Sequence, residues 1–347
     1  MDLSGVAERV WYGRDTTARA ARAALAPFEL LFRGVVAARG RLYDAGALAS
    51  HPLALPAISV GNLTVGGTGK TPLSAWLVGE LLAHGAHPAL VLRGVGDDEA
   101  RVHALLNPQA PVVVAPDRVA GVREARERGA DLVVLDDAFQ HRRARRDVDL
   151  VLASAERTRG RTRLLPAGPF RESPDALRRA SALCVTRRTA GASDAQQVAE
   201  RLAAAAPGLP WAVVHLAVDV LRCWRASDGV ATAQQGIAAL DGARVLAVSG
   251  IGDPAAFEAQ LAACGARVVG ARHVDHHAYT DADAAVLASR ARGVDLVVTT
   301  LKDAVKLGPR WPRGAPPLWY VSQRVVVERG APVLDGLLRT LLTTRRT

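Results

Sequence analysis

The chain has 347 residues, which is enough for two domains with substantial cores. Its formal net charge of +10, from 44 basic and 34 acidic side chains, suits an anionic partner such as a nucleotide, a nucleic acid or an acidic lipid surface. The three cysteines are scattered without a C-x-x-C pair, which argues against a disulfide framework or a cysteine metal site. No uncharged apolar run of about 18 residues occurs, and no secretion signal is evident, so we expect no membrane-spanning helix.

Residues 16–45 are predicted to form a basic amphipathic helix. Apolar and aromatic side chains recur at three- and four-residue spacing, and arginines flank them: Phe28, Leu31, Phe32, Val35, Leu42 and Tyr43, with Arg19, Arg22, Arg33, Arg39 and Arg41. Such a helix can lie on a membrane, with its arginines on anionic headgroups, or it can pack on its own domain. Periodicity alone leaves both arrangements open.

Between Leu55 and Thr186, short apolar runs alternate with helical patterns. The predicted strands are 57–60, 89–92, 111–115, 132–135, 148–153 and 182–185, and the predicted helices lie near 73–84, 119–128 and 174–180. Strands without polar alternation, separated by helices, indicate an α/β fold with a parallel sheet that is covered on both faces. Ligands of such a sheet bind at the carboxyl ends of its strands.

The segment Gly61–Thr71, GNLTVGGTGKT, lies between the first of these strands and the first of these helices. Its glycines allow backbone N–H groups to surround phosphate oxygens at a helix N-terminus. The pattern predicts that Lys70 binds the β- and γ-phosphates and that Thr71 binds Mg²⁺. Thr64 stands where the general phosphate-loop pattern has glycine, so an ordinary glycine-rich turn is the alternative. Only three lysines occur in the chain, Lys70, Lys302 and Lys306, and one of them stands in this loop.

Polar clusters follow other predicted strands. Asp136 and Asp137, at the start of the segment DDAFQH, stand where a phosphate-loop protein keeps a Mg²⁺-organising acid, although they can equally be solvated turn residues. The acidic run Gly96–Glu99 can supply a general base or be an acidic loop. Leu164–Glu172 is a loop punctuated by proline and glycine, and long ordered loops tend to be functional.

The alternation breaks around residues 219–240, where we place a linker that contains a hairpin. A second α/β set follows, with strands at 245–248, 267–269, 296–299 and 318–321 and helices at 254–263, 281–292 and 332–342. Its polar strand ends are Ser249–Pro254, His273–Thr280 and Thr299–Lys306. Asp275, His276 and His277 can act in acid–base or substrate contacts, can be structural, or can bind zinc, but no further ligand stands at a suitable spacing.

Six of these clusters, in this order, resemble the tetraacyldisaccharide 4′-kinase family of lipid A biosynthesis. The matching segments are Gly61–Thr71, Asp136–His141, Leu164–Glu172, Gly250–Phe257, Asp275–Tyr279 and Thr300–Lys306, with Ala138 where the family has glycine and Leu301 where it has glutamate. The resemblance runs from about Trp11 to Lys306. It implies a kinase that uses ATP and Mg²⁺ to phosphorylate the 4′-hydroxyl of tetraacyldisaccharide 1-phosphate, which gives lipid IVA and ADP.

The resemblance also implies an architecture and partners. Residues 1–45 would associate with an anionic membrane surface at the cytoplasmic face of the bacterial inner membrane, residues 46–218 would form the ATP-binding domain, 219–240 the linker hairpin, and 241–347 a smaller C-terminal α/β domain. The expected substrate is an acylated disaccharide lipid, and we expect a monomer that does not bind nucleic acid, because the chain has no recognition module.

The residue roles that the resemblance implies fall into four groups. The nucleotide-binding residues are Gly61, Asn62, Thr64, Val65, Gly66, Gly67, Thr68, Gly69, Lys70, Thr71, Gln140 and His141. The catalytic residues are Asp98, His276, Lys70, Asp136 and Asp137. The Mg²⁺ ligands are Thr71, Asp137 and Glu99, and the residues that contact substrate or nucleotide are Arg171 and Glu172. Asp98 and His276 would together take the proton of the acceptor hydroxyl, and they would join the two domains, so that domain closure assembles the site.

The chain departs from the family pattern before the acidic run. Arg93, Gly94 and Val95 lead directly into Gly96, where the family has a further variable stretch, and Ala100 replaces a proline. This shortening leaves open whether Asp97 or Asp98 is the acid of the pair. The alternative functions are a switch-type or metallochaperone-type P-loop NTPase and a P-loop kinase of another acceptor.

Overall fold

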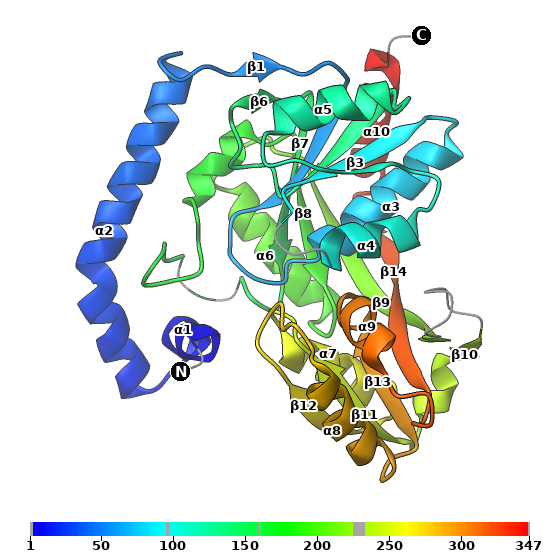
Figure 1. The fold of residues 1–347 in the computed structure, drawn as a ribbon. Coiled ribbons are helices and arrows are strands. Elements are labelled where there is room, and N and C mark those ends of the chain that lie inside the picture. The colour runs from blue at the N-terminus through cyan, green and yellow to red at the C-terminus, as the bar shows by residue number, and fades with distance from the viewer. Residues whose placement is uncertain (1–2, 95–97, 159, 161, 225–232, 346–347) are drawn as a thin grey trace. The chain divides into compact units, whose positions relative to one another are not determined.

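The computed structural model of the protein describes residues 3–94, 98–158, 160, 162–224 and 233–345 (Figure 1). The chain divides into two units: unit 1 comprises Met1–Gly94, Asn107–Val214 and Val327–Thr347, and unit 2 comprises Val95–Leu106 and His215–Val326. Strands β9 (Trp211–Cys223) and β14 (Leu318–Arg329) each contain a point where the chain passes from one unit to the other.

Unit 1 is built on a parallel sheet. In chain order its elements are α1 (Leu3–Tyr12), α2 (Thr16–Asp44), β1 (His51–Pro52), β2 (Ala57–Asn62), α3 (Lys70–Ala83), β3 (Pro88–Leu92), β4 (Val112–Val114), α5 (Arg118–Glu127), β5 (Leu132–Asp136), β6 (Ala144–Arg145), β7 (Val148–Ser154), η1 (Pro174–Arg179), β8 (Ala182–Arg187), α6 (Ala192–Ala203) and α10 (Ala331–Thr344). The strand order is β8-β7-β2-β5-β3-β4, and every pair is parallel. All residues of β2, β3 and β5 are buried, as expected for strands covered by helices on both faces.

The register of this sheet determines which polar residues are neighbours. Strand β2 lies between β5 and β7, and Val60 of β2 pairs with Asp136 of β5. The loop that follows β2 and the acidic pair that follows β5 therefore leave the sheet side by side. This is the strand-end edge at which open α/β sheets bind their ligands.

Helix α2 has one side that packs on unit 1 and another that is exposed. Glu29 is buried and accepts hydrogen bonds from Leu164 N (2.8 Å) and Arg163 Nη1 (3.3 Å). Phe32 packs against the hydrophobic cluster that contains Leu164, while Leu31 and Val35 are 67% and 60% exposed. Of the helices that the structure describes, none has the length and apolar character needed to cross a bilayer.

Unit 2 has its own parallel sheet, in the order β12-β11-β13-β14. Its other elements accompany these strands in the chain: α4 (Asp98–Leu106), β10 (Gln234–Gly236), η2 (Ile237–Leu240), β11 (Arg244–Ser249), α7 (Pro254–Ala263), β12 (Arg267–Arg272), α8 (Asp281–Ala291), β13 (Leu296–Thr300), α9 (Leu301–Leu307) and η3 (Gly308–Arg310). Helix α8 begins with a capping box between Thr280 and Asp283. Strand β10 pairs antiparallel with β9, and the turn expected between them lies outside the described residues.

The α/β fold with a parallel phosphate-loop sheet is confirmed, but three local expectations are corrected. Residues 174–179 form a short 3₁₀ helix instead of an α-helix, with Ser173 as its N-cap and Pro174 as its first residue. The acidic run is not a loop at Asp98, because Asp98 and Glu99 form the first turn of α4, where carboxylates suit the helix dipole. Helix α4 belongs to unit 2, since Val102 is buried in the cluster of Leu246 and Val305.

Helix α10 also belongs to a different unit from the one that its position in the sequence suggests. Residues 241–347 were expected to form one domain, but Val327–Thr347 is part of unit 1. The apolar face of α10 is buried, and Arg345, just after the helix, donates to Gly85 O (3.0 Å) and pairs with Asp131 (3.2 Å). The chain thus returns to unit 1 at its end.

Candidate active site

The loop between β2 and α3 has the backbone that a phosphate-binding loop needs. Gly66 and Gly69 have φ values of 95° and 83°, in the left-handed region that other residues avoid. Gly69 is the N-cap of α3, and Lys70 is the first residue of the helix. The N-terminus of a 14-residue helix therefore faces the loop, which favours an anion there.

Two side chains at the carboxyl end of β8 hold this loop by its carbonyl oxygens. Thr186 Oγ1 donates to Thr68 O (2.9 Å), and Arg188 Nη1 donates to Gly67 O (3.1 Å). Within the loop, Asn62 Nδ2 donates to Thr68 Oγ1 (2.9 Å). Val65 N donates to Pro169 O (2.8 Å) and Thr68 N donates to Gly66 O (2.9 Å), so these two N–H groups stabilise the loop itself. The left-handed glycines give the backbone the kind of turn in which successive N–H groups can point toward one anion.

The segment Asp136–His141 packs directly against the loop. A Cβ on Gly61 would lie 2.4 Å from Phe139 Cβ, so only glycine fits at that position. Gln140 Nε2 donates to Asn62 O (2.9 Å), which makes Gln140 a support of the loop in this geometry. Burial, together with the charges of Arg118 and Arg146, lowers the pKa of His141 and favours its neutral form.

Asp137 lies between two cations. Lys70 Nζ is 3.7 Å from Asp137 Oδ1, and Arg171 Nη1 donates to both carboxylate oxygens at 3.1 Å. Asp137 itself has a left-handed backbone, with φ of 49°, which a residue with a side chain adopts only at a cost. Asp136 accepts from Ser74 Oγ (3.1 Å). Lys70, Asp137 and Arg171, predicted separately, are thus brought together in unit 1.

The remaining predicted residues of unit 1 have different surroundings. Glu172 pairs with Arg179 (2.6 Å), whose guanidinium lies 4.6 Å from the centre of the Phe139 ring. Thr71 is the second residue of α3, beside Lys70. Its hydroxyl and the Asp137 carboxylate are oxygen donors of the kind that Mg²⁺ prefers, so the residues present fit that ion.

In unit 2, Asp98 and His276 form a pair. His276 Nδ1 is 3.4 Å from Asp98 Oδ2, and the Asp98 side chain is 5% exposed. Burial alone raises the pKa of Asp98, but the hydrogen bond from His276 and the charge of Lys306 outweigh burial and lower it to about 2. The same hydrogen bond raises the pKa of His276. A charged carboxylate that holds one ring nitrogen is the arrangement in which an imidazole accepts a proton.

The sequence predicted that this pair joins the two units, and this prediction is wrong. Both residues belong to unit 2, because α4 packs on α9 through the core cluster that includes Val102 and Val305. Asp97, the alternative acid, lies outside the described residues. Glu99, predicted as a Mg²⁺ ligand, has Lys302 Nζ at 2.8 Å, and its role in metal binding stays a prediction.

The zinc alternative for Asp275, His276 and His277 finds no support. His276 faces Asp98, whereas His277 Nε2 is 3.2 Å from Asp283 and its ring stacks on His273 at 4.5 Å. Adjacent side chains with different partners do not converge on one metal. Over the part of the chain that the structure describes, no group of three or more His, Cys, Asp or Glu residues could hold a metal ion.

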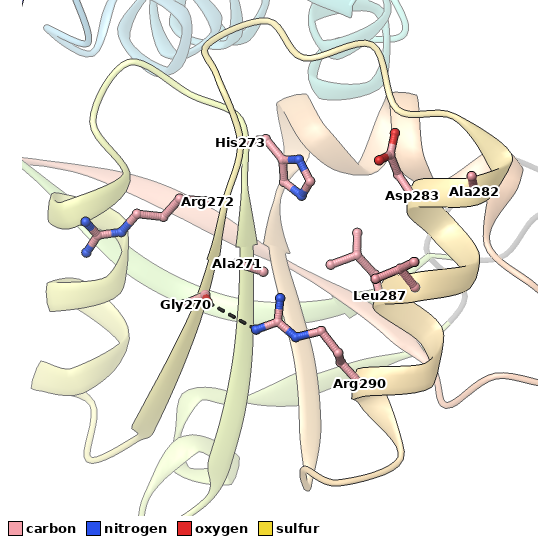
Figure 2. A pocket seen from close by; sticks show the side chains of 9 residues that line it. Gly270, Ala271, Arg272, His273, Ala282, Asp283, Leu287 and Arg290 are labelled. Carbon is pink, nitrogen blue, oxygen red and sulfur yellow. Dashed lines mark hydrogen bonds between the residues drawn. The ribbon is translucent and has the colours of Figure 1, made fainter. Parts of the chain in front are cut away.

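An open pocket of about 330 Å³ lies elsewhere in unit 2, between β12 and α8 (Figure 2). Arg290 Nη2 donates to Gly270 O across it (3.3 Å), and Asp283 already caps α8. None of the predicted site residues lines it.

Sequence reasoning assigned no role to three charged residues, of which Arg118 and Asp303 are buried and Lys306 is partly buried. Arg118 is 2% exposed and donates to Asp136 O (3.1 Å), so it stabilises the acidic pair. Asp303 and Lys306 lie beside Asp98 in unit 2. The rarity of lysine supported only Lys70, and the position of Lys306 beside Asp98 depends on packing that no local pattern encodes.

The chain is similar to the members of one family of kinases. The family model described as tetraacyldisaccharide-1-P 4′-kinase matches residues 21–343. A tetraacyldisaccharide 4′-kinase of Anaeromyxobacter sp. (strain Fw109-5) is 41% identical over an alignment of 334 residues, covering 88% of this chain and 88% of the relative. Another, of Halorhodospira halophila (strain DSM 244 / SL1), is 37% identical over 341 residues, covering 92% of this chain and 93% of the relative. The crystal structure of "apo" form LpxK from Aquifex aeolicus in complex with ATP has a TM-score of 0.70 and 27% identity, and covers 94% of this chain and 100% of that chain.

Proposed function

The chain belongs to the tetraacyldisaccharide-1-P 4′-kinase family, and we propose that it transfers the γ-phosphate of ATP to the 4′-hydroxyl of tetraacyldisaccharide 1-phosphate. The bond between the acceptor oxygen and the γ-phosphorus forms while the bond from that phosphorus to the β–γ bridging oxygen breaks. The products are lipid IVA and ADP. The proton of the hydroxyl passes to the Asp98–His276 pair.

The observation that carries the proposal is the cluster of Lys70, Asp137 and Arg171 beside the phosphate loop. The glycine-rich loop and the N-terminus of α3 bind the phosphates, and Lys70 neutralises charge on the transferred group. Mg²⁺, held by Thr71 and Asp137, would neutralise further charge on the phosphates. Asp137 contacts both Lys70 and Arg171, so both cations are oriented before the substrate arrives.

The Asp98–His276 pair acts on the hydroxyl group of the acceptor. A sugar hydroxyl is a weak nucleophile, and its oxygen gains reactivity as its proton is removed. Asp98 fixes Nδ1 of His276 and stabilises positive charge on the ring, so that the pair accepts the proton as the new bond forms.

The activity is tested with purified protein, Mg²⁺, γ-labelled ATP and tetraacyldisaccharide 1-phosphate in detergent. The account predicts label in the lipid fraction that depends on the lipid and on Lys70. A matched control is Arg126→Gln, which removes an exposed cation of unit 1 from α5. Hydrolysis of ATP without labelled lipid would contradict the proposal and favour a switch-type NTPase or another acceptor.

We further propose that α2 binds the anionic cytoplasmic face of the inner membrane, where an acylated substrate resides. Leu30, Leu31 and Val35 are 60–67% exposed, which is unfavourable in water but suits an interface. We expect the wild-type chain to sediment with vesicles of phosphatidylglycerol and phosphatidylcholine. In the double variant Leu31→Asp/Val35→Asp, most of this vesicle-bound fraction should be lost. The exposed control Val286→Asp, in unit 2, should bind as the wild type does. Equal binding by both variants would contradict this role of α2.

A further inference from the structure

Lys306 lies on α9 with its ammonium group enclosed but without a hydrogen bond to any described residue. The nearest carboxylate oxygens are Asp98 Oδ2 at 3.6 Å and Asp303 Oδ1 at 3.7 Å. The ammonium also lies 5.7 Å from the centre of the Tyr279 ring. Burial of a charge is costly unless opposite charges compensate it. The position of Lys306 is therefore fixed by two carboxylates and an aromatic ring.

Asp303 connects three separate segments of unit 2. Its side chain is fully buried, and its Oδ1 accepts from Gly250 N (3.0 Å) and from Tyr279 Oη (3.1 Å). Its Oδ2 accepts from Thr300 Oγ1 (2.7 Å). One carboxylate thus ties the ends of β11 and β13 to the segment before α8.

Two routes lead from Asp303 to the acid–base pair. In the first, Gly250, held by Asp303, accepts the backbone N–H of His276 at 3.1 Å. That bond supports the left-handed backbone of His276, whose φ is 58°. In the second, Asp303 holds Lys306, and Lys306 lies against the Asp98 carboxylate.

We propose that Asp303 and Lys306 are positioning residues of the Asp98–His276 pair. Asp303 fixes the backbone turn that presents His276, and Lys306 fixes the Asp98 carboxylate against Nδ1 of His276. This inference rests on the proposed function, because it takes the pair to be the group that receives the acceptor's proton. An apolar side chain would fill the same space over Tyr279 without the cost of burying charge, so the ammonium does more than fill space.

The first test separates turnover from binding. Lys306→Met keeps the length and approximate volume of the side chain and removes its charge. We expect kcat to fall about ten- to a hundredfold while the KM values for ATP and lipid stay within about twofold, because positioning acts on the transition state. Lys306→Arg, which keeps the charge, should restore part of the loss. The control Arg310→Gln removes an exposed cation of the same unit and should change neither constant.

The second test does not depend on activity. In ¹⁵N-histidine NMR of the full chain, the imidazole signal of His276, assigned by its loss in His276→Gln, should shift in Lys306→Met and in Asp303→Asn but not in Arg310→Gln. Asp303→Asn keeps an acceptor oxygen for Gly250 N and Tyr279 Oη, so the fold should survive, and thermal melting checks this.

The outcomes of these tests are distinct. A wild-type chain that transfers no phosphate to lipid overturns the proposed function. An active chain whose kcat is unchanged in Lys306→Met, or whose His276 signal is unmoved in both variants, overturns the positioning role.

Discussion

Each of the two units places one residue with a side chain in the left-handed backbone region: Asp137 in unit 1, with φ of 49°, and His276 in unit 2, with φ of 58°. Among the described residues these are the two non-glycine residues with positive φ. Such a conformation costs about 1 kcal/mol or more for an L-residue, so the surrounding contacts must impose it. In both units the strained residue belongs to the predicted site.

The two units differ in how they impose it. In unit 1 the site follows from one contiguous loop and the adjacent strand end, because Val60 and Asp136 pair in the sheet. In unit 2 it is assembled from three separate segments around the buried carboxylate of Asp303 and from α4, which carries Asp98. The proposed phosphate-binding loop can therefore be recognised from a short motif, whereas the proposed acid–base pair depends on tertiary packing.

The largest effect is expected at the phosphate side. Lys70→Met removes the cation beside Asp137, and we expect lipid kinase activity to fall about a thousandfold with weakened ATP binding, because charge stabilisation dominates phosphoryl transfer. Single-turnover transfer and titration calorimetry with ATP measure the two effects. If the rate of phosphate transfer falls less than about tenfold in Lys70→Met, Lys70 does not have the proposed role in the reaction.

A substitution in the acid–base pair should lower turnover without weakening ATP binding. His276→Ala should lower kcat about a hundredfold or more and leave the dissociation constant of ATP within about twofold. The matched control is His277→Ala, since His277 contacts Asp283 and not Asp98. Similar losses of ATP affinity in Lys70→Met and His276→Ala would contradict the proposal that unit 1 binds ATP while His276 of unit 2 acts on the acceptor.

Gly61 tests the packing that supports the contiguous site. Gly61→Ala places a methyl group 2.4 Å from Phe139 Cβ, and such overpacking should lower the free energy of unfolding by about 1–3 kcal/mol. Gly34→Ala in α2 meets nothing within 4 Å and should stabilise the helix by about 0.5–1 kcal/mol. Urea denaturation measures both, and opposite signs are expected. A neutral Gly61→Ala would show that the loop moves away from Phe139 freely.

Asp98 should make the free energy of unfolding depend on pH. Its pKa is about 2 in the folded chain, below the ordinary 3.8, so its charged form stabilises the fold above about pH 4. That contribution, on the order of 2 kcal/mol, is lost as the pH falls from about 4 through about 2. The gap in free energy of unfolding between wild type and Asp98→Asn should therefore be widest near neutral pH and narrow in acid. The exposed control Asp281→Asn should show a small gap at every pH, and a constant gap for Asp98→Asn would contradict the assignment.

The sequence predicted the strands of both sheets well because uninterrupted apolar runs such as 57–60 and 132–135 mark buried parallel strands. It missed α4 as a helix because its first turn is acidic and only Val102 and a few neighbours face a core. It placed α10 in the wrong unit because contiguity in sequence does not determine packing. The roles of Asp303 and Lys306 were not predictable, since Asp303 contacts Gly250 across 53 residues and Lys306 contacts Asp98 on α4, much earlier in the chain.

The most direct test of the account is the chemical identity of the product. The full chain is incubated with ATP, Mg²⁺ and tetraacyldisaccharide 1-phosphate, and the lipid is analysed by ³¹P–¹H correlation NMR. The account predicts one new phosphomonoester coupled to the proton on carbon 4′, with the 1-phosphate retained, and no such signal with Lys70→Met. Inorganic phosphate as the product, or a phosphate on another hydroxyl, would contradict it.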